Sequence, residues 1–148
     1  MRTQKGFTLV EILIVVVILG ILAAIVIPQF TDASTEAKTS SLSSDLQTVR
    51  SQIELYKIQH NDDVPAPESA TSWNRMIQYS DIDGVVSATK STTYCYGPYL
   101  QKVPTNQFNN LSTVTADTST PAGSGSGWHL NTDTGAFHAN DSNDHAGL

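Results

Sequence analysis

Residues 6–28 read GFTLVEILIVVVILGILAAIVIP, which is the most apolar stretch of the chain. From Ile12 to Ile27 every residue is Ile, Leu, Val, Ala or Gly. A helix from Phe7 to Ile27 would be about 32 Å long at ~1.5 Å per residue, which matches the roughly 30 Å hydrocarbon core of a bilayer. We therefore expect residues 7–27 to form a membrane-spanning helix.

Glu11 is the one charged residue within this apolar stretch. A carboxylate inside a membrane helix costs about 2.5–3.5 kcal/mol on insertion scales, so its natural partner is a cation. The apolar run after Glu11 supplies no cation. Cleavage after Gly6 would create one, because Phe7 would then carry a free α-amino group that is largely protonated at neutral pH.

The charges that flank the apolar run set its orientation. Arg2 and Lys5 precede the run and no acidic residue does, so the positive-inside rule places the N-terminus in the cytoplasm and the remainder across the membrane. One alternative is an ordinary secretory signal peptide, but the run is long, no small-x-small site follows it, and Glu11 interrupts it. The other is a plain membrane anchor, which leaves Gly6 and Glu11 without a role.

Residues 5–28 resemble the class III signal of type IV pilins and type II secretion pseudopilins. The resemblance implies cleavage between Gly6 and Phe7 by a prepilin peptidase, followed by N-methylation of Phe7. It also implies that Glu11 meets the Phe7 amine of a neighbouring subunit during filament assembly. Gly20 and Pro28 fall where the family has a glycine and a proline that let the helix loosen, and both residues are poor helix formers.

Composition narrows the range of functions. The 148-residue chain has a net charge of −6, and loss of Arg2 and Lys5 with the leader would make it more acidic still. Nucleic-acid binding is therefore not expected, because it rests on Lys and Arg contacts to phosphate. Cys95 is the only cysteine, so no intrachain disulfide can form, in contrast to many type IV pilins. We expect Cys95 to be a small, buried apolar residue.

The pattern after Pro28 predicts that the helix continues to about His60, with two apolar stripes. No Pro or Gly interrupts residues 29–60, and the segment 61–67, which holds two prolines, should end the helix. One stripe at helical spacing should cover a globular domain; it consists of Leu42, Leu46, Val49, Ile53 and Tyr56. A nearly opposite stripe, which could face other helices, consists of Ala33, Ala37, Leu55 and Ile58.

Beyond the helix we expect a small α+β region with an antiparallel sheet. Ser72 should cap a short helix at residues 73–79, and residues 94–106 resemble an ordered Gly-Pro-Tyr-Leu…Pro loop of major pseudopilins. Further expected elements are a strand within 111–118, a mobile exposed loop at 119–127, a hairpin of 127–131 with 136–140 turning at Gly135, and a frayed tail at 141–148.

No sequence motif indicates an enzyme: there is no phosphate-binding loop, zinc spacing or nucleophile elbow. We expect His129, His138 and His145 to be solvent-facing polar residues. The resemblance to major pseudopilins implies calcium in the C-terminal loop, and oxygen ligands of the right kind are available in Asp117, Asp133, Asp141 and Asp144. The family's closing pattern is not recognisable here, so we expect no cofactor and assign no metal ligands.

These observations predict a pilin-like α+β fold in which a long N-terminal helix packs on a small antiparallel sheet. The expected divisions are a leader (1–6), a membrane helix (7–27), an amphipathic helix (28–60) and a periplasmic or extracellular region (61–148). The predicted function is that of a filament subunit in the bacterial inner membrane, most similar to a type II secretion pseudopilin supporting protein export. Its expected partners are copies of itself, a prepilin peptidase, an assembly platform and minor pseudopilins. A type IV or competence pilin acting in adhesion, motility or DNA uptake and a membrane-tethered binding domain are the alternatives.

Overall fold

The computed structural model describes residues 6–121, 123 and 125–148. Residues 1–5, which form most of the predicted leader, lie outside the described residues, as do Ala122 and Ser124 of the predicted mobile loop. The chain divides into two compact units, Met1–Ala37 and Lys38–Leu148. Helix α1 (Leu9–Gln59) is continuous and contributes to both units.

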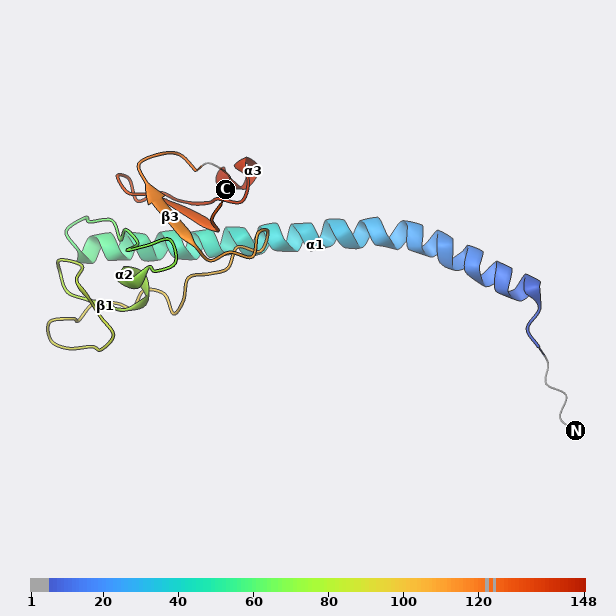
Figure 1. The fold of residues 1–148 in the computed structure, drawn as a ribbon, viewed down its shortest axis with the longest axis horizontal. Helices are drawn as coiled ribbons and strands as arrows, with labels where there is room; N and C mark the ends of the chain where they lie inside the picture. The colour runs from blue at the N-terminus through green and yellow to red at the C-terminus, as the bar shows by residue number, and fades with distance from the viewer. Residues whose placement is uncertain (1–5, 122, 124) are drawn as a thin grey trace, which may run out of the picture. The chain divides into compact units, whose positions relative to one another are not determined.

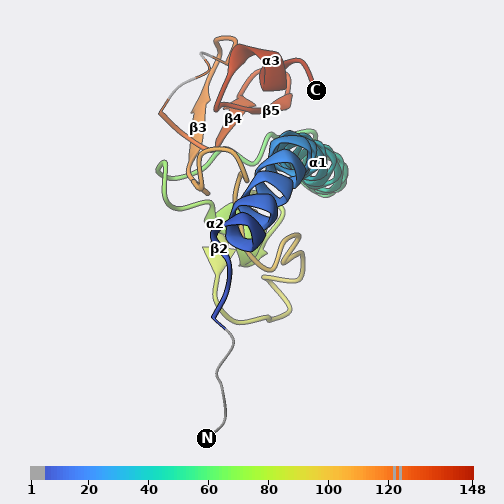
Figure 2. The same cartoon turned by 90° about the vertical axis from the view of Figure 1, so that its right-hand side faces the viewer.

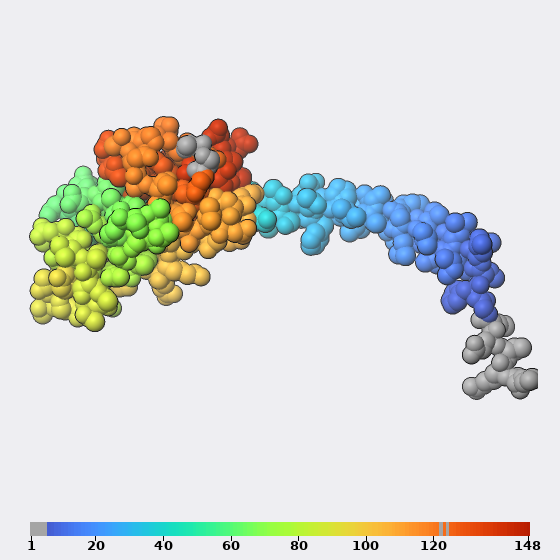
Figure 3. Space-filling model, viewed as in Figure 1, coloured from blue at the N-terminus to red at the C-terminus, as the bar shows by residue number. Residues whose placement is uncertain are grey.

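In the first unit, α1 has no covering from the described chain. Every residue from Gly6 to Lys38 is exposed, and the large apolar side chains between Phe7 and Phe30 are 52–83% exposed (Figure 3). By length and composition, α1 is the one helix within the described residues that could cross a membrane. The hydroxyls of Thr31 and Thr35 bond to the backbone carbonyls four residues earlier, each at 3.1 Å, so they need no partner outside the helix.

In the second unit, the predicted apolar stripe of α1 is confirmed as the centre of the core. Its five side chains, Leu42, Leu46, Val49, Ile53 and Tyr56, are at most 1% exposed. They pack in one cluster with residues of the other elements, including Trp73, Met76, Trp128, Leu130 and Phe137. The ring centroid of Phe137 lies 5.5 Å from that of Trp73 and 5.3 Å from that of Trp128, so aromatic stacking joins distant parts of the sequence.

Helix α1 ends at Gln59, close to the predicted position, through a left-handed cap. Asn61 and Asp62 have φ values of 56° and 70°. The Asp62 N–H donates to the Lys57 carbonyl at 2.8 Å, which is the six-to-one bond of a Schellman motif. The helix therefore stops before the Pro65 restriction is reached, and Asn and Asp are the non-glycine residues that tolerate this conformation best.

The strands form two small sheets on different sides of the part of α1 in the second unit (Figures 1 and 2). One sheet pairs β1 (Tyr79–Ser80) with β2 (Val86–Ser87) in antiparallel fashion. The other has the order β3-β4-β5, with β3 at Val114–Asp117, β4 at Trp128–Asn131 and β5 at Phe137–Ala139. The predicted hairpin is confirmed: β4 and β5 are antiparallel, Leu130 faces Phe137, and Gly135 takes a φ of 76°.

The predicted α+β fold, in which the long helix packs on small sheets, is confirmed. The sheets are not wholly antiparallel as expected, because β3 and β4 run parallel, with Val114 opposite Trp128 and Asp117 opposite Asn131. Residues 118–127 return the chain to the start of β3 before β4 begins, so the two strands point the same way. A strand pattern in sequence shows which residues alternate between faces, and it does not show the direction of the partner strand.

Three local predictions are also corrected. Helix α2 (Asn74–Ile77) is shorter than predicted and Ser72 does not cap it; the Glu68 carboxylate accepts a hydrogen bond from the Asn74 N–H at 2.8 Å. Cys95 is exposed rather than buried. The supposed frayed tail contains α3 (Asn143–Ala146), whose first turn is capped by the Ser142 side chain.

Candidate functional site

The residues predicted to direct processing lie in an accessible segment at the start of α1. Gly6, Phe7 and Thr8 precede the helix, and Phe7 is 83% exposed. A Cβ placed on Gly6 would meet no atom within 4 Å. The Gly6–Phe7 peptide bond is therefore open to an approaching protease in the single chain, as a cleavage site must be.

Glu11 and Thr8 form a reciprocal capping box at the helix N-terminus. The Glu11 Oε2 atom accepts hydrogen bonds from the Thr8 N–H and the Thr8 Oγ1, both at 2.8 Å. In return, the Glu11 N–H donates to Thr8 Oγ1 at 3.2 Å. Thr8 is the N-cap and Glu11 the third helical residue, which is the spacing that this motif requires.

The capping box gives Glu11 a role inside its own chain that the sequence reasoning missed. The signal was present as Thr-x-x-Glu directly before an apolar run. The carboxylate also lies near the positive end of the helix dipole, which stabilises a negative charge. Glu11 therefore has a local partner before any neighbouring subunit arrives, and any test of its role in assembly must separate charge from capping.

Gly20 and Pro28 lie within the uninterrupted helix α1. A Cβ on Gly20 would meet nothing within 4 Å outside the helix backbone. Pro28 cannot donate the backbone hydrogen bond of its turn. Their role in loosening the helix during assembly stays a prediction.

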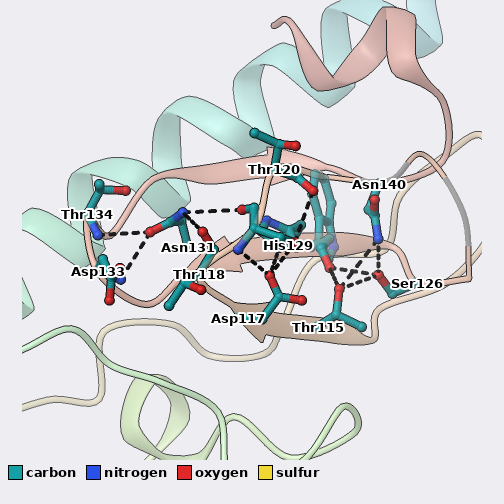
Figure 4. Close-up of polar contacts among 12 residues, drawn as sticks. Thr115, Asp117, Thr118, Thr120, Ser126, His129, Asn131, Asp133, Thr134 and Asn140 are labelled. Carbon is teal, nitrogen blue, oxygen red and sulfur yellow. Dashed lines mark hydrogen bonds and ion pairs between the residues drawn. The ribbon is translucent and has the colours of Figure 1, made fainter.

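The outer face of the three-stranded sheet is polar (Figure 4). The Ser126 hydroxyl lies 3.0 Å from the Thr115 hydroxyl and accepts a bond from the Asn140 side-chain amide at 2.8 Å. Ser126 is 1% exposed and Asn140 is 3% exposed. The end of the predicted exposed loop is thus folded onto the sheet, contrary to expectation, since the hydroxyl and amide groups supply each other's hydrogen bonds.

His129 is buried against Asp117 on this same face, which corrects its predicted exposure. Its Nε2 donates to Asp117 Oδ1 at 3.1 Å, and His129 is 2% exposed. Its Nδ1 is buried with no partner among the described residues. Hydrogen bonds from Ser119 and from His129 lower the pKa of Asp117 to about 2.

A second histidine–carboxylate pair lies in the C-terminal segment. His145 Nδ1 and Asp141 Oδ2 are 2.5 Å apart, and Asn106 Nδ2 donates to Asp141 Oδ1 at 2.7 Å. Burial acts to raise the pKa of Asp141, but the hydrogen bonds from Asn106 and His145 outweigh it and the pKa lies below its usual value. The His138 Nδ1 donates to the Ala146 carbonyl at 2.9 Å, so it too is held within the fold rather than simply facing solvent.

These features define a class of protein: an uncovered apolar helix with an N-terminal capping glutamate, continued into the core of a small α+β unit. This is the architecture of a pilin-like subunit. The family described as "Prokaryotic N-terminal methylation motif" matches residues 1–27. No solved structure matches the chain.

Several curated relatives are named type II secretion system core protein G. The chain is 31% identical over 108 residues to the type II secretion system core protein G of Klebsiella pneumoniae, covering 70% of this chain and 69% of that one. It is 46% identical over 57 residues to the core protein G of Pseudomonas aeruginosa, covering 38% and 40% respectively. The chain therefore belongs to the pilin-like family that includes the type II secretion core protein G subunits.

Some of the matches cover a smaller part of the two chains. Matches to the P. aeruginosa and Dickeya chrysanthemi proteins span only 40% and 39% of those relatives. The type IV major alpha-pilin of Moraxella bovis is 38% identical over 72 residues, which cover 49% of this chain and 45% of the pilin. The shorter matches extend over less than half of each chain.

Proposed function

We propose that this chain is a structural subunit of a pilin-like filament and acts as a major pseudopilin of type II secretion, supporting protein export. One observation carries the proposal: the apolar face of α1 from Phe7 to Phe30 is entirely uncovered, with large side chains 52–83% exposed. Such a surface has to be buried in lipid or against other helices. A filament subunit uses both environments in turn.

Processing follows from the accessible N-terminal segment. A prepilin peptidase cleaves between Gly6 and Phe7, and the new Phe7 amine is methylated. The chain is a single-pass protein of the bacterial inner membrane, with its N-terminus in the cytoplasm and its globular unit outside. The matching methylation motif at residues 1–27 supports this processing. Intact mass of membrane-extracted protein should give a mature chain beginning at methylated Phe7; a dominant species that retains Met1 would contradict it.

In assembly, Glu11 changes its partner. In the single chain its carboxylate caps its own helix through Thr8. In the filament it pairs with the methylated Phe7 ammonium of a neighbouring subunit, which fixes the axial register between apolar helices. Charges attract strongly where water is excluded, so the ion pair can replace the hydrogen bonds that Thr8 donates to the carboxylate. Gly20 and Pro28 allow the helix to loosen as subunits pack.

The partners in this scheme are copies of the chain, the peptidase, an inner-membrane assembly platform and minor pseudopilins. The named relatives are secretion-system, pilin and fimbrial proteins, and this chain acts as such a subunit rather than as an enzyme. The similarity to the M. bovis pilin favours a type IV pilin as the second candidate. The absence of cysteines other than Cys95 fits a pseudopilin better, since no disulfide can close its C-terminal region.

The decisive experiment separates the charge of Glu11 from its capping role. Glu11→Gln keeps an oxygen that can accept from the Thr8 N–H, because Gln serves in the same capping motif, but it removes the charge. We expect cleaved protein and a fall in sheared filament yield of about tenfold or more, since hydrogen bonds to charged groups contribute about 1.5–3 kcal/mol.

Thr8→Val is the matched control. It removes the hydroxyl bonds to Glu11 and leaves the carboxylate in place, so filaments should form at nearly wild-type yield when cleavage is intact. Glu11→Asp, which is one methylene shorter, should show a milder defect than Glu11→Gln. Normal filaments from cleaved Glu11→Gln would refute the ion pair.

A further inference from the structure

Calcium, which the resemblance to major pseudopilins implies, can be tested against the oxygen atoms of the C-terminal region. Calcium requires six to eight oxygen ligands, commonly carboxylates and carbonyls. Of the four candidate aspartates, Asp117, Asp133 and Asp144 are exposed, and Asp141 is partly buried. Asp117 and Asp141 already accept hydrogen bonds from histidine and other donors. Within the described part of the chain, no group of three or more acidic, histidine or cysteine side chains could hold a metal ion.

The surroundings of Asp141 are built from hydrogen-bond donors. The Asn106 amide is fully buried, and its orientation is fixed at both ends: Oδ1 accepts from the Phe108 N–H at 2.9 Å, while Nδ2 donates to the Gly127 carbonyl and to Asp141. An amide N–H directed at a carboxylate cannot ligate a cation. His145 completes the site on the other oxygen. The hydrogen-bond donors around Asp141 suit a carboxylate and do not suit a calcium ion.

The Asp141–His145 pair joins segments far apart in sequence. Through Asn106 it connects the region before α3 to the loop after Pro104 and to the start of β4 at Gly127. The His145 ring also lies against Phe108, with centroids 4.0 Å apart. The side chains of His145 and Asp141 are 20% and 6% exposed, so solvent screens their attraction only weakly.

The Asp117–His129 pair also joins separate segments of the chain, at the other end of the sheet. Asp117 Oδ1 accepts from the Ser119 N–H at 2.7 Å and from the buried His129 ring at 3.1 Å. These bonds connect the end of β3, the first turn of the 118–127 connection and the middle of β4. A bridging calcium ion would make links of this kind between carboxylates.

We propose that the pairs Asp141–His145 and Asp117–His129 close the C-terminal region in place of a calcium ion, so that folding of this unit is independent of calcium. The chain supplies the positive or hydrogen-bonding partner of each carboxylate from its own histidines. This inference concerns the globular unit alone and stands whether or not the chain assembles through Glu11.

The first test uses the full chain in detergent micelles, with thermal unfolding followed by the fluorescence of Trp73 and Trp128, both buried in the second unit. The midpoint should be the same in excess CaCl2 and in excess EGTA, and calorimetric titration with CaCl2 should show no saturable binding. A lower midpoint in EGTA, or saturable binding, would overturn the proposal.

The second test is a double-mutant cycle on the more buried pair. Asp141→Asn and His145→Gln should each lower the midpoint by about 3–6 °C. The double variant should lower it by no more than the larger single effect, because both changes remove one interaction. Asp144→Asn, a control in the same segment at an exposed position, should leave the midpoint unchanged. Additive losses, or an equal loss in Asp144→Asn, would contradict the pair; if the Asp141 variant fails to fold, His145→Gln and the calcium comparison remain decisive.

Discussion

In the unit formed by residues 1–37, every described residue of α1 is exposed, whereas in the unit formed by residues 38–148 the same helix buries five side chains to 1% exposure or less. The first unit is the more apolar of the two and has no apolar partner within the described chain. The second is less apolar and has a complete core. Hydrophobicity alone therefore does not show which part of a helix is buried within its own chain.

The physical reason lies in periodicity. Residues 12–27 are apolar on all faces, which is the pattern of a helix surrounded by lipid or by other helices. Among residues 42–56 the buried apolar side chains lie on one stripe, whereas Leu55, on the nearly opposite stripe, is 40% exposed. The first unit depends on its surroundings for stability, and the second depends on its own tertiary contacts.

The largest expected effect is the contrast between Leu46→Ala and Leu19→Ala. Leu46 is 1% exposed and Leu19 is 58% exposed. Leu46→Ala should lower the free energy of unfolding of the second unit by about 2–5 kcal/mol, because it leaves a cavity. Leu19→Ala should change it by less than about 0.5 kcal/mol and should reduce filament yield instead. Urea unfolding of the full chain in micelles, followed by tryptophan fluorescence, measures the change in unfolding free energy for both variants. Equal losses of unfolding free energy would remove the distinction between the units.

A smaller contrast is expected between two glycines. Gly84 has a φ of +76°, and an added Cβ would lie 2.6 Å from the Tyr56 hydroxyl oxygen. Gly84→Ala should therefore destabilise the second unit by about 1–3 kcal/mol. Gly20→Ala meets no such obstacle and favours the helix by about 1 kcal/mol. It should leave the unfolding of the second unit unchanged, and reduced filament yield would show that a loose helix at Gly20 matters for assembly. A destabilised second unit would contradict the open surroundings of Gly20.

The smallest effect expected is a pH dependence confined to the second unit. The pKa of His138 is lowered, mainly because the side chain is partly buried. Its hydrogen bond to the Ala146 carbonyl acts to raise the pKa, and repulsion from Arg50 and His129 lowers it further. A histidine with a lowered folded-state pKa contributes stability above its unfolded pKa of about 6.5, and this is lost as the pH falls through the folded value. The lowered pKa values of Asp141 and Asp117 contribute stability above about pH 4, which is lost on further acidification.

Thermal unfolding at a series of pH values between 7 and 3 tests this. The midpoint should fall gradually below about pH 6.5 and more steeply below about pH 4. His138→Gln should weaken the first decline and Asp141→Asn the second. A midpoint that rises steadily from pH 7 to pH 5 would contradict the assignment for His138.

The sequence predicted the long helix well, because its signals are local and repeated. Apolar continuity identified the first unit, and the spacing of Leu42, Leu46 and Val49 identified the buried stripe of the second. The hairpin at Gly135 was equally predictable, since a turn residue between two alternating segments needs no information from elsewhere. The role of Glu11 was predicted from its charge, and its capping partner Thr8 was overlooked although the motif was complete in the sequence.

The misplaced side chains belong to the region where contacts are distant in sequence. Cys95 is exposed although it lies between Tyr94 and Tyr96, so these neighbouring tyrosines gave no indication of its environment. His129 is buried beside Asp117 because β3 pairs in parallel with β4, and no local pattern predicts that pairing. The tail is ordered because Asp141 accepts a hydrogen bond from Asn106, which lies 35 residues earlier.

Residue spacing alone is enough to predict the apolar helix, its capping motif, the buried stripe and the hairpin, because each depends on residues that are near in sequence. The parallel pairing of β3 with β4, the polar face of the sheet and the partners of His129 and His145 became visible in the folded chain alone. The reason is that strand direction and the pairing of charges depend on which segments meet in space, and the composition of the connection between β3 and β4 does not show which segments it brings together.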